Sequence, residues 1–158
     1  MALACVAIGV AAVRVAPGLL TSRPDPFVSR SGTTLLVNGH PFRFSGANVF
    51  WGALDPDART GLSYPTPFRV QAALRTAADM GEKVIRCQTC GISTGTPLSV
   101  EPVLGGFSQT ALRHIDYFVA QAQAYGMKLV IPFTDNYHYY LGSYCDFTNW
   151  LHLSAPSD

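Results

Sequence analysis

The stretch from Tyr64 to Cys87, YPTPFRVQAALRTAADMGEKVIRC, decides the fold class. Thr66 is a suitable helix N-cap, and Pro67 fits the first helical position, where no backbone N–H is needed. Apolar side chains then recur at helical spacing on one face, at Val70, Ala73, Leu74 and Ala77. Gly81 is placed to end the helix, and Lys83–Cys87 reads as a short strand. The stretch therefore predicts a helix over about 67–80 that leads into a strand.

The segment downstream repeats this plan. Ser108 can cap a helix that runs to about Tyr125, whose expected buried face is formed by Leu112, Ile115, Val119 and Ala122. The apolar run Lys128–Phe133 follows without alternation, which is typical of a strand covered on both faces.

Short strands separated by tight turns precede the first helix. The turns are expected at Ser31–Thr33 and at Asn38–Pro41, and Phe42–Phe50 is expected as a further strand. The order strand, helix, strand, helix, strand predicts an α/β fold with parallel strands and right-handed crossovers, preceded by a β-hairpin.

Composition and charge exclude several classes of protein. Of 158 residues, 48% are hydrophobic and 13% charged, which excludes a disordered polar chain. Lys and Arg number 11 against 10 Asp and Glu, so 11 − 10 gives a net charge of +1. Without a basic stripe, nothing favours nucleic acid or an anionic membrane as a partner.

The first residues are expected to form a separate segment. Residues 2–13 are apolar, and the polar, Pro-rich stretch TSRPDP follows at 21–26. We expect a signal or anchor segment over 1–22, a linker over 23–26, a folded unit over 27–152 and a tail over 153–158, in an extracellular or secreted protein. A misassigned start codon or a disordered apolar N-terminus is the alternative interpretation.

In proteins with parallel sheets, the catalytic and binding residues lie beyond the carboxyl ends of the strands. Amides, aromatics and hydroxyl groups gather there, in the segments 48–51, 86–107 and 135–140. Aromatic rings stack on sugar faces and amides bind hydroxyl groups, so the mixture suits a neutral polyhydroxylated ligand. No Gly-rich phosphate loop follows a strand, and no cofactor is expected.

Two of the four cysteines, Cys87 and Cys90, form a C-x2-C motif without a second pair. Zinc would also need Cys145 and a histidine such as His138 or His152, so we expect no metal. In an exported chain Cys90 and Cys145 could form a disulfide. The favoured interpretation is that the cysteines are free, small residues at the rim of the sheet.

The chain resembles the endo-β-mannanase-like group of glycoside hydrolase family 5, from Phe27 to Trp150. The matching pieces, in order, are FVSRSGTTLLVNGHPFRF (27–44), GANVFW (46–51), VIR (84–86), RHID (113–116) and LVIPFTDNYHYY (129–140). The resemblance implies the first three strands or so of a (β/α)8 TIM barrel, and an enzyme that hydrolyses β-1,4-linked polysaccharides or oligosaccharides with retention.

The resemblance also shows what this sequence lacks. The family's acid/base is a Glu that follows an Asn at the end of strand four, and its nucleophile is a Glu at the end of strand seven. This sequence has no Asn-Glu pair and only two Glu, Glu82 and Glu101. Such a barrel needs about 250 residues. Glu101 and Asp135, both in upper loops, are the only carboxyl pair worth considering as catalytic, and we interpret Glu101 as a loop carboxylate and Asp135 as a helix-capping or loop-bracing residue.

Several residues of this sequence match residues that support catalysis or bind the substrate in the family. Arg86 matches the family's strand-two Arg, which orients the nucleophile carboxylate. Trp51 falls where the family places aromatics that face the substrate, and Asn136, Tyr137 and His138 fall where strand three supplies contacts to the sugar. A barrel-top core position is the alternative for Trp51. His40 and His114 are expected to be surface residues.

Two functional interpretations stay open. The chain is the leading part of a retaining mannan-type endo-hydrolase, inactive as it stands because both catalytic Glu are absent. Alternatively, it is a degenerate, non-catalytic barrel remnant that acts as a weak glycan-binding module. The oligomeric state and the polysaccharide do not follow from the sequence.

Overall fold

The computed structural model describes residues 27–57, 61–134 and 144–154. The expected signal segment and linker, at 1–22 and 23–26, lie outside these residues. So do Asp135, Asn136, Tyr137 and His138. No described helix is long and apolar enough to cross a membrane.

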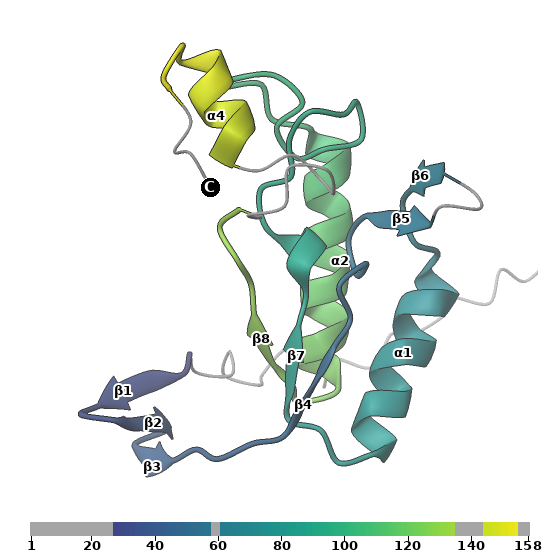
Figure 1. The fold of residues 1–158 in the computed structure, drawn as a ribbon. Helices are drawn as coiled ribbons and strands as arrows, with labels where there is room; N and C mark the ends of the chain where they lie inside the picture. Colours follow the sequence, from purple (N-terminus) through teal and green to yellow (C-terminus); the bar gives the residue numbers. More distant parts are fainter. Residues whose placement is uncertain (1–26, 58–60, 135–143, 155–158) are drawn as a thin grey trace, which may run out of the picture.

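A three-stranded parallel sheet forms the centre of the fold (Figure 1). Its strands, in spatial order, are β4 (Gly46–Asn48), β7 (Val84–Arg86) and β8 (Lys128–Val130). Helix α1 (Pro67–Asp79) connects the first two strands, and α2 (Gln109–Ala124) connects the second to the third. The mixed α/β class expected from the sequence is confirmed.

Both long helices begin where their capping residues predict. The Thr66 side chain accepts a hydrogen bond from the Arg69 backbone N–H at 3.3 Å, and the Ser108 side chain accepts one from Ala111 at 3.3 Å. Gly81, with φ 83°, follows α1 in the left-handed region that favours glycine. These local capping bonds account for the two starts that the sequence predicts.

The buried face of α2 agrees with the prediction at Ala122 and differs from it at the other positions. Ala111, Phe118 and Ala122 are buried, whereas Leu112, Ile115 and Val119 are half-buried. The reason is Phe118, which is fully buried against the backbone of Gly52: a Cβ on Gly52 would lie 2.4 Å from its ring. Seating this large ring turns the helix so that its face is centred on Phe118.

The N-terminal strands form an antiparallel meander at the amino end of the parallel strands (Figure 1). It consists of β1 (Ser29–Ser31), β2 (Thr34–Val37) and β3 (His40–Pro41). The expected continuous strand Phe42–Phe50 is wrong, because pairing with β2 ends with the bond from the Phe42 N–H to the Leu35 carbonyl at 2.7 Å, and strand structure resumes only at Gly46. At Gly46 the backbone approaches β7 so closely that a Cβ would lie 2.6 Å from the Val84 carbonyl oxygen.

Several short elements lie at the opposite, carboxyl end. They are the hairpin of β5 (Asp55–Asp57) and β6 (Gly61–Ser63), the 3-10 turn η1 (Gln88–Cys90) and helix α4 (Tyr144–Trp150). None of these elements was predicted from the sequence. Strand β8 is shorter than expected, and Val130 and Ile131 are exposed, so the expected cover on both faces is not seen among the described residues.

Candidate functional site

The last residues of the three parallel strands stand side by side. Asn48 pairs with Arg86, and Arg86 pairs with Val130. In the preceding row Ala47, Ile85 and Leu129 pack against the core beneath the helices. Side chains alternate along a strand, so the row of Asn48, Arg86 and Val130 faces away from α1 and α2. All three are exposed.

Arg86 presents its guanidinium on this open face. Its Nη1 donates a hydrogen bond to Gln88 Oε1 at 3.4 Å, two residues along the chain. A guanidinium carries five donors in a rigid fork that matches a carboxylate. This hydrogen bond is long and engages one of these donors, so the geometry suits capture of an anionic or hydroxyl-rich group.

Trp51 lies in the loop after β4, at the same end of the sheet. The Arg69 guanidinium stands over its ring, 4.0 Å from the centroid. Arg69 also forms an ion pair with Asp55, which is buried. The half-buried Trp51 packs against the core as well. One face of the ring is therefore occupied by the protein's own cation, which narrows the surface it can offer to a ligand.

Sequence reasoning missed Arg69 and Asp55. Arg69 sits on the first turn of α1, at a position that reads as solvent-facing in a helical pattern. Asp55 comes from the hairpin β5–β6, which the Asp55-Pro56 pair and Gly61 could have indicated as a turn. Their meeting depends on how the loop after β4 folds back over α1, and local sequence does not record that path.

The cysteines differ from the sequence expectation. Cys87 and Cys90 form a disulfide, with Cα atoms 5.4 Å apart, whereas Cys145 carries a thiol. The favoured interpretation of free cysteines is wrong for this pair, and Cys90 is not bridged to Cys145. The cause is local: the 3-10 turn η1 folds the two cysteines back on each other, within the range that a disulfide spans.

Glu101 braces its own loop. It is 5% exposed, its Oε1 accepts a hydrogen bond from the Gly105 N–H at 2.7 Å, and its backbone N–H donates to the Ser93 carbonyl at 2.9 Å. These contacts agree with the interpretation of Glu101 as a loop carboxylate, while Asp135 lies outside the described residues. Among the described residues, no group of three His, Cys, Asp or Glu could hold a metal ion.

His114 is not a plain surface residue. It is half-buried and stacks on Tyr64, with ring centroids 4.0 Å apart and planes at 9°. Burial lowers the pKa of His114 below its usual value, and the neighbouring Arg113 charge adds to the effect. The Tyr64 hydroxyl in turn donates to the Leu98 carbonyl at 3.0 Å, so the stack ties α2 to the loop after η1. His40, by contrast, is exposed, as expected.

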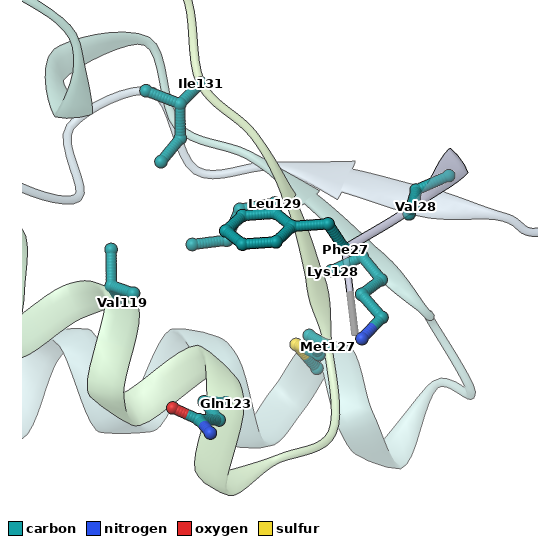
Figure 2. Close-up of a pocket in the computed structure, with 8 residues that line it drawn as sticks. All are labelled: Phe27, Val28, Val119, Gln123, Met127, Lys128, Leu129 and Ile131. Carbon is teal, nitrogen blue, oxygen red and sulfur yellow. The ribbon is translucent and has the colours of Figure 1, made fainter. Parts of the chain in front are cut away.

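Grooves flank both outer strands of the sheet. One lies between α2 and β8, and Figure 2 labels the residues that line it, among which Phe27 is exposed. The other lies between β4 and α1 and includes Trp51 and Arg69 in its lining. Both are bounded mainly by apolar side chains, and each runs along a strand that has a partner on one side only among the described residues.

Comparison with curated proteins finds mannan-degrading enzymes. Mannan endo-1,4-beta-mannosidase 2 of Oryza sativa subsp. japonica is 31% identical over 120 residues, covering 74% of this chain and 25% of that protein. Mannan endo-1,4-beta-mannosidase 3 of Arabidopsis thaliana is 27% identical over 143 residues, covering 89% and 33%. The chain thus spans a quarter to a third of the length of these relatives. No family model matches.

Solved structures give the same result for the fold. A glycoside hydrolase family 5 mannosidase from Rhizomucor miehei, in complex with mannosyl-fructose, superposes with a TM-score of 0.67 at 20% identity, covering 80% of this chain and 31% of that chain. An endo-1,4-beta-mannanase from the same organism gives 0.64 at 18% identity, covering 81% and 35%. The resemblance seen in the sequence motifs is confirmed over part of the length of these enzymes.

Proposed function

Over the residues that match, this chain belongs with the mannanase-like enzymes of glycoside hydrolase family 5, and we propose that it forms the leading strands and helices of a (β/α)8 barrel that binds β-1,4-linked mannan-type glycans. The observation that carries this proposal is the aligned row of Asn48 and Arg86 at the carboxyl edge of the sheet. Ligands of parallel α/β sheets bind at that edge. The loop that holds Trp51 borders the same edge.

The proposal assigns support rather than bond cleavage to these residues. Retaining hydrolysis needs two carboxyl groups about 5–5.5 Å apart across one sugar. Glu82 precedes β7 and so stands at the amino end of the sheet, and Glu101 is buried and engaged with Gly105. Arg86 would hold the nucleophile carboxylate in place and keep it ionised, because a guanidinium favours the charged form.

Complementation tests this assignment. The full chain is mixed with a polypeptide that carries the strands of the Rhizomucor miehei mannanase which this chain does not match, and release of reducing ends from mannan is measured. We expect no release from the chain alone and release from the mixture. Arg86→Ala should abolish the restored activity, whereas Arg75→Ala, on the exposed side of α1, should preserve it.

Two results would contradict the proposal. Reducing ends released by the pure chain and lost on Glu101→Gln would make Glu101 catalytic. A mixture whose activity survives Arg86→Ala would remove the role given to Arg86. Retardation of the chain alone in a mannan-containing gel, lost with Trp51→Ala and without any complementation, would favour the non-catalytic glycan-binding module.

Export is a separate part of the proposal. The apolar run over 2–13 and the Pro-rich stretch over 21–26 support removal or membrane retention of residues 1–22. Mass spectrometry of protein secreted by a suitable host should find a mature N-terminus between Ser22 and Phe27. An intact N-terminus on cytosolic protein would contradict it.

A further inference from the structure

The disulfide-closed turn η1 lies in the loop after β7 and contacts the loops that follow β4 and β8. Thr89, at its centre, is 2% exposed, and its Oγ1 accepts hydrogen bonds from the backbone N–H groups of Ala53 and Leu54, both at 3.1 Å. The Thr89 N–H donates to the Phe50 carbonyl at 2.9 Å. One residue of the turn thus makes three hydrogen bonds to the short loop that carries Trp51.

The ends of the turn reach β8 and the loop that follows it. The Cys87 N–H donates to the Val130 carbonyl at 3.1 Å, and the Ile92 N–H donates to the Phe133 carbonyl at 2.9 Å. A Cβ on Gly91 would lie 2.3 Å from the Pro132 carbonyl oxygen, so this backbone packs directly on the loop after β8. Gln88, inside the turn, is the residue to which Arg86 donates.

The disulfide closes this turn covalently. Its N-cap, Cys87, makes no side-chain capping hydrogen bond, and the backbone bond from the Cys90 N–H to the Cys87 carbonyl is long at 3.4 Å. Short 3-10 turns have poor hydrogen-bond geometry and form as single turns. The covalent link removes the open conformations that such a turn would otherwise populate.

We propose that the Cys87–Cys90 disulfide, acting through Thr89, positions the loop of Trp51 at the carboxyl edge of the sheet, and that reduction of this disulfide releases the loop. Thr89 is in this sense a positioning residue. The proposal rests on the proposed function only for the roles given to Trp51 and Arg86. Its test reads the loop itself, so a failure to bind glycan would leave it standing.

The redox step is an ordinary thiol–disulfide exchange. One thiolate of a dithiol such as dithiothreitol attacks a sulfur of the bridge, and a mixed disulfide forms with one protein thiolate as leaving group. The second thiol of the reagent then closes a cyclic disulfide and releases the other protein sulfur. The reagent loses two electrons and two protons, and Cys87 and Cys90 become thiols. Both cysteines are buried, so the exchange requires a local opening of the turn.

The experiment uses the full chain carrying Trp150→Phe, which leaves Trp51 as its one tryptophan. Amide hydrogen exchange over 50–54 and Trp51 emission with acrylamide quenching are measured before and after reduction, with thiol titration to confirm that two thiols appear. We expect exchange at Ala53 and Leu54 to accelerate about tenfold, as loss of buried hydrogen bonds implies. Exchange in α1 should not change, and Trp51 should become more accessible to quencher.

Two variants at Thr89 separate the effect of the disulfide from the effect of the Thr89 hydroxyl group. Thr89→Val keeps the disulfide but removes the acceptor, so it should accelerate exchange at Ala53 and Leu54 as reduction does. Thr89→Ser keeps the acceptor and should restore slow exchange. Unchanged exchange over 50–54 after reduction would overturn the proposal. Equal acceleration in α1 with Thr89→Val would also overturn it, because the residue would then support the whole fold instead of the loop.

Discussion

Arg69→Met should destabilise the chain more than Asp55→Ala, although both changes break the same ion pair. The asymmetry follows from where each charge lies. The Arg69 side chain is 43% exposed, so water can hydrate its guanidinium when Asp55 is absent. The Asp55 side chain is only 6% exposed, so its carboxylate stays buried when Arg69 is absent.

The magnitudes can be worked from these exposures. In Asp55→Ala the lost pair is worth about 1 kcal/mol or less, because the exposed arginine discounts it for solvent screening. In Arg69→Met the buried carboxylate loses a partner, which costs roughly 1–3 kcal/mol. Loss of the contact over the Trp51 ring adds about 0.5–1 kcal/mol. The double variant contains no orphaned carboxylate, so it should be less destabilised than the sum of the single variants by at least about 1 kcal/mol.

A double-mutant cycle measures this coupling. Urea unfolding of the four proteins, followed by far-ultraviolet circular dichroism, gives the free energy of unfolding of each one. Trp51 emission in the Trp150→Phe background should shift in both variants that lack Arg69. Additivity of the two single changes within about 0.5 kcal/mol would refute the reasoning, because independent sites add to that precision.

Three further changes test other contacts. Gly52→Ala should destabilise the chain by roughly 1–3 kcal/mol in thermal melts, because the new methyl group meets the Phe118 ring; adding Phe118→Leu should recover part of the loss, and no recovery would contradict the packing argument. For His114, the lowered pKa means that the unfolded chain takes up the proton first as pH falls below about 6.5. The free energy of unfolding should therefore fall as the pH decreases from about 6.5 to the pKa of His114 in the folded chain. The urea midpoint of His114→Gln should not show this fall. Thr94→Val removes a 2.6 Å hydrogen bond to Asp146 Oδ2 and should accelerate amide exchange in α4, while Thr94→Ser should not.

The parts of the fold that local chemistry decides could be predicted from sequence. Helix starts at Thr66 and Ser108 depend on a single side chain and the next turn, and they were predicted correctly. The buried face of α2 was not, because four small or medium apolar residues and one Phe compete for the interior. The choice between them depends on Gly52, which is distant in sequence and leaves room for the ring of Phe118.

The site shows the same division. Strand ends set the position of Arg86, and the apolar pattern of the strand located it. The disulfide was missed because a C-x2-C motif has no single meaning: metal ligands, redox pairs and free cysteines share it. What selects the disulfide here is the 3-10 turn, and that turn lies in a loop whose backbone path has no periodic signal.

Trp51 shows how far this structure constrains the proposed glycan contact. An indole ring has two faces, and Arg69 covers one at 4.0 Å while the core takes part of the remaining surface. A sugar could therefore stack only on the uncovered side, and only while the loop keeps its position. Asp55 fixes Arg69 from one direction and Thr89 fixes the loop backbone from the other. The orientation of this single aromatic thus depends on a buried carboxylate and a bridged turn, neither of which would itself touch the glycan.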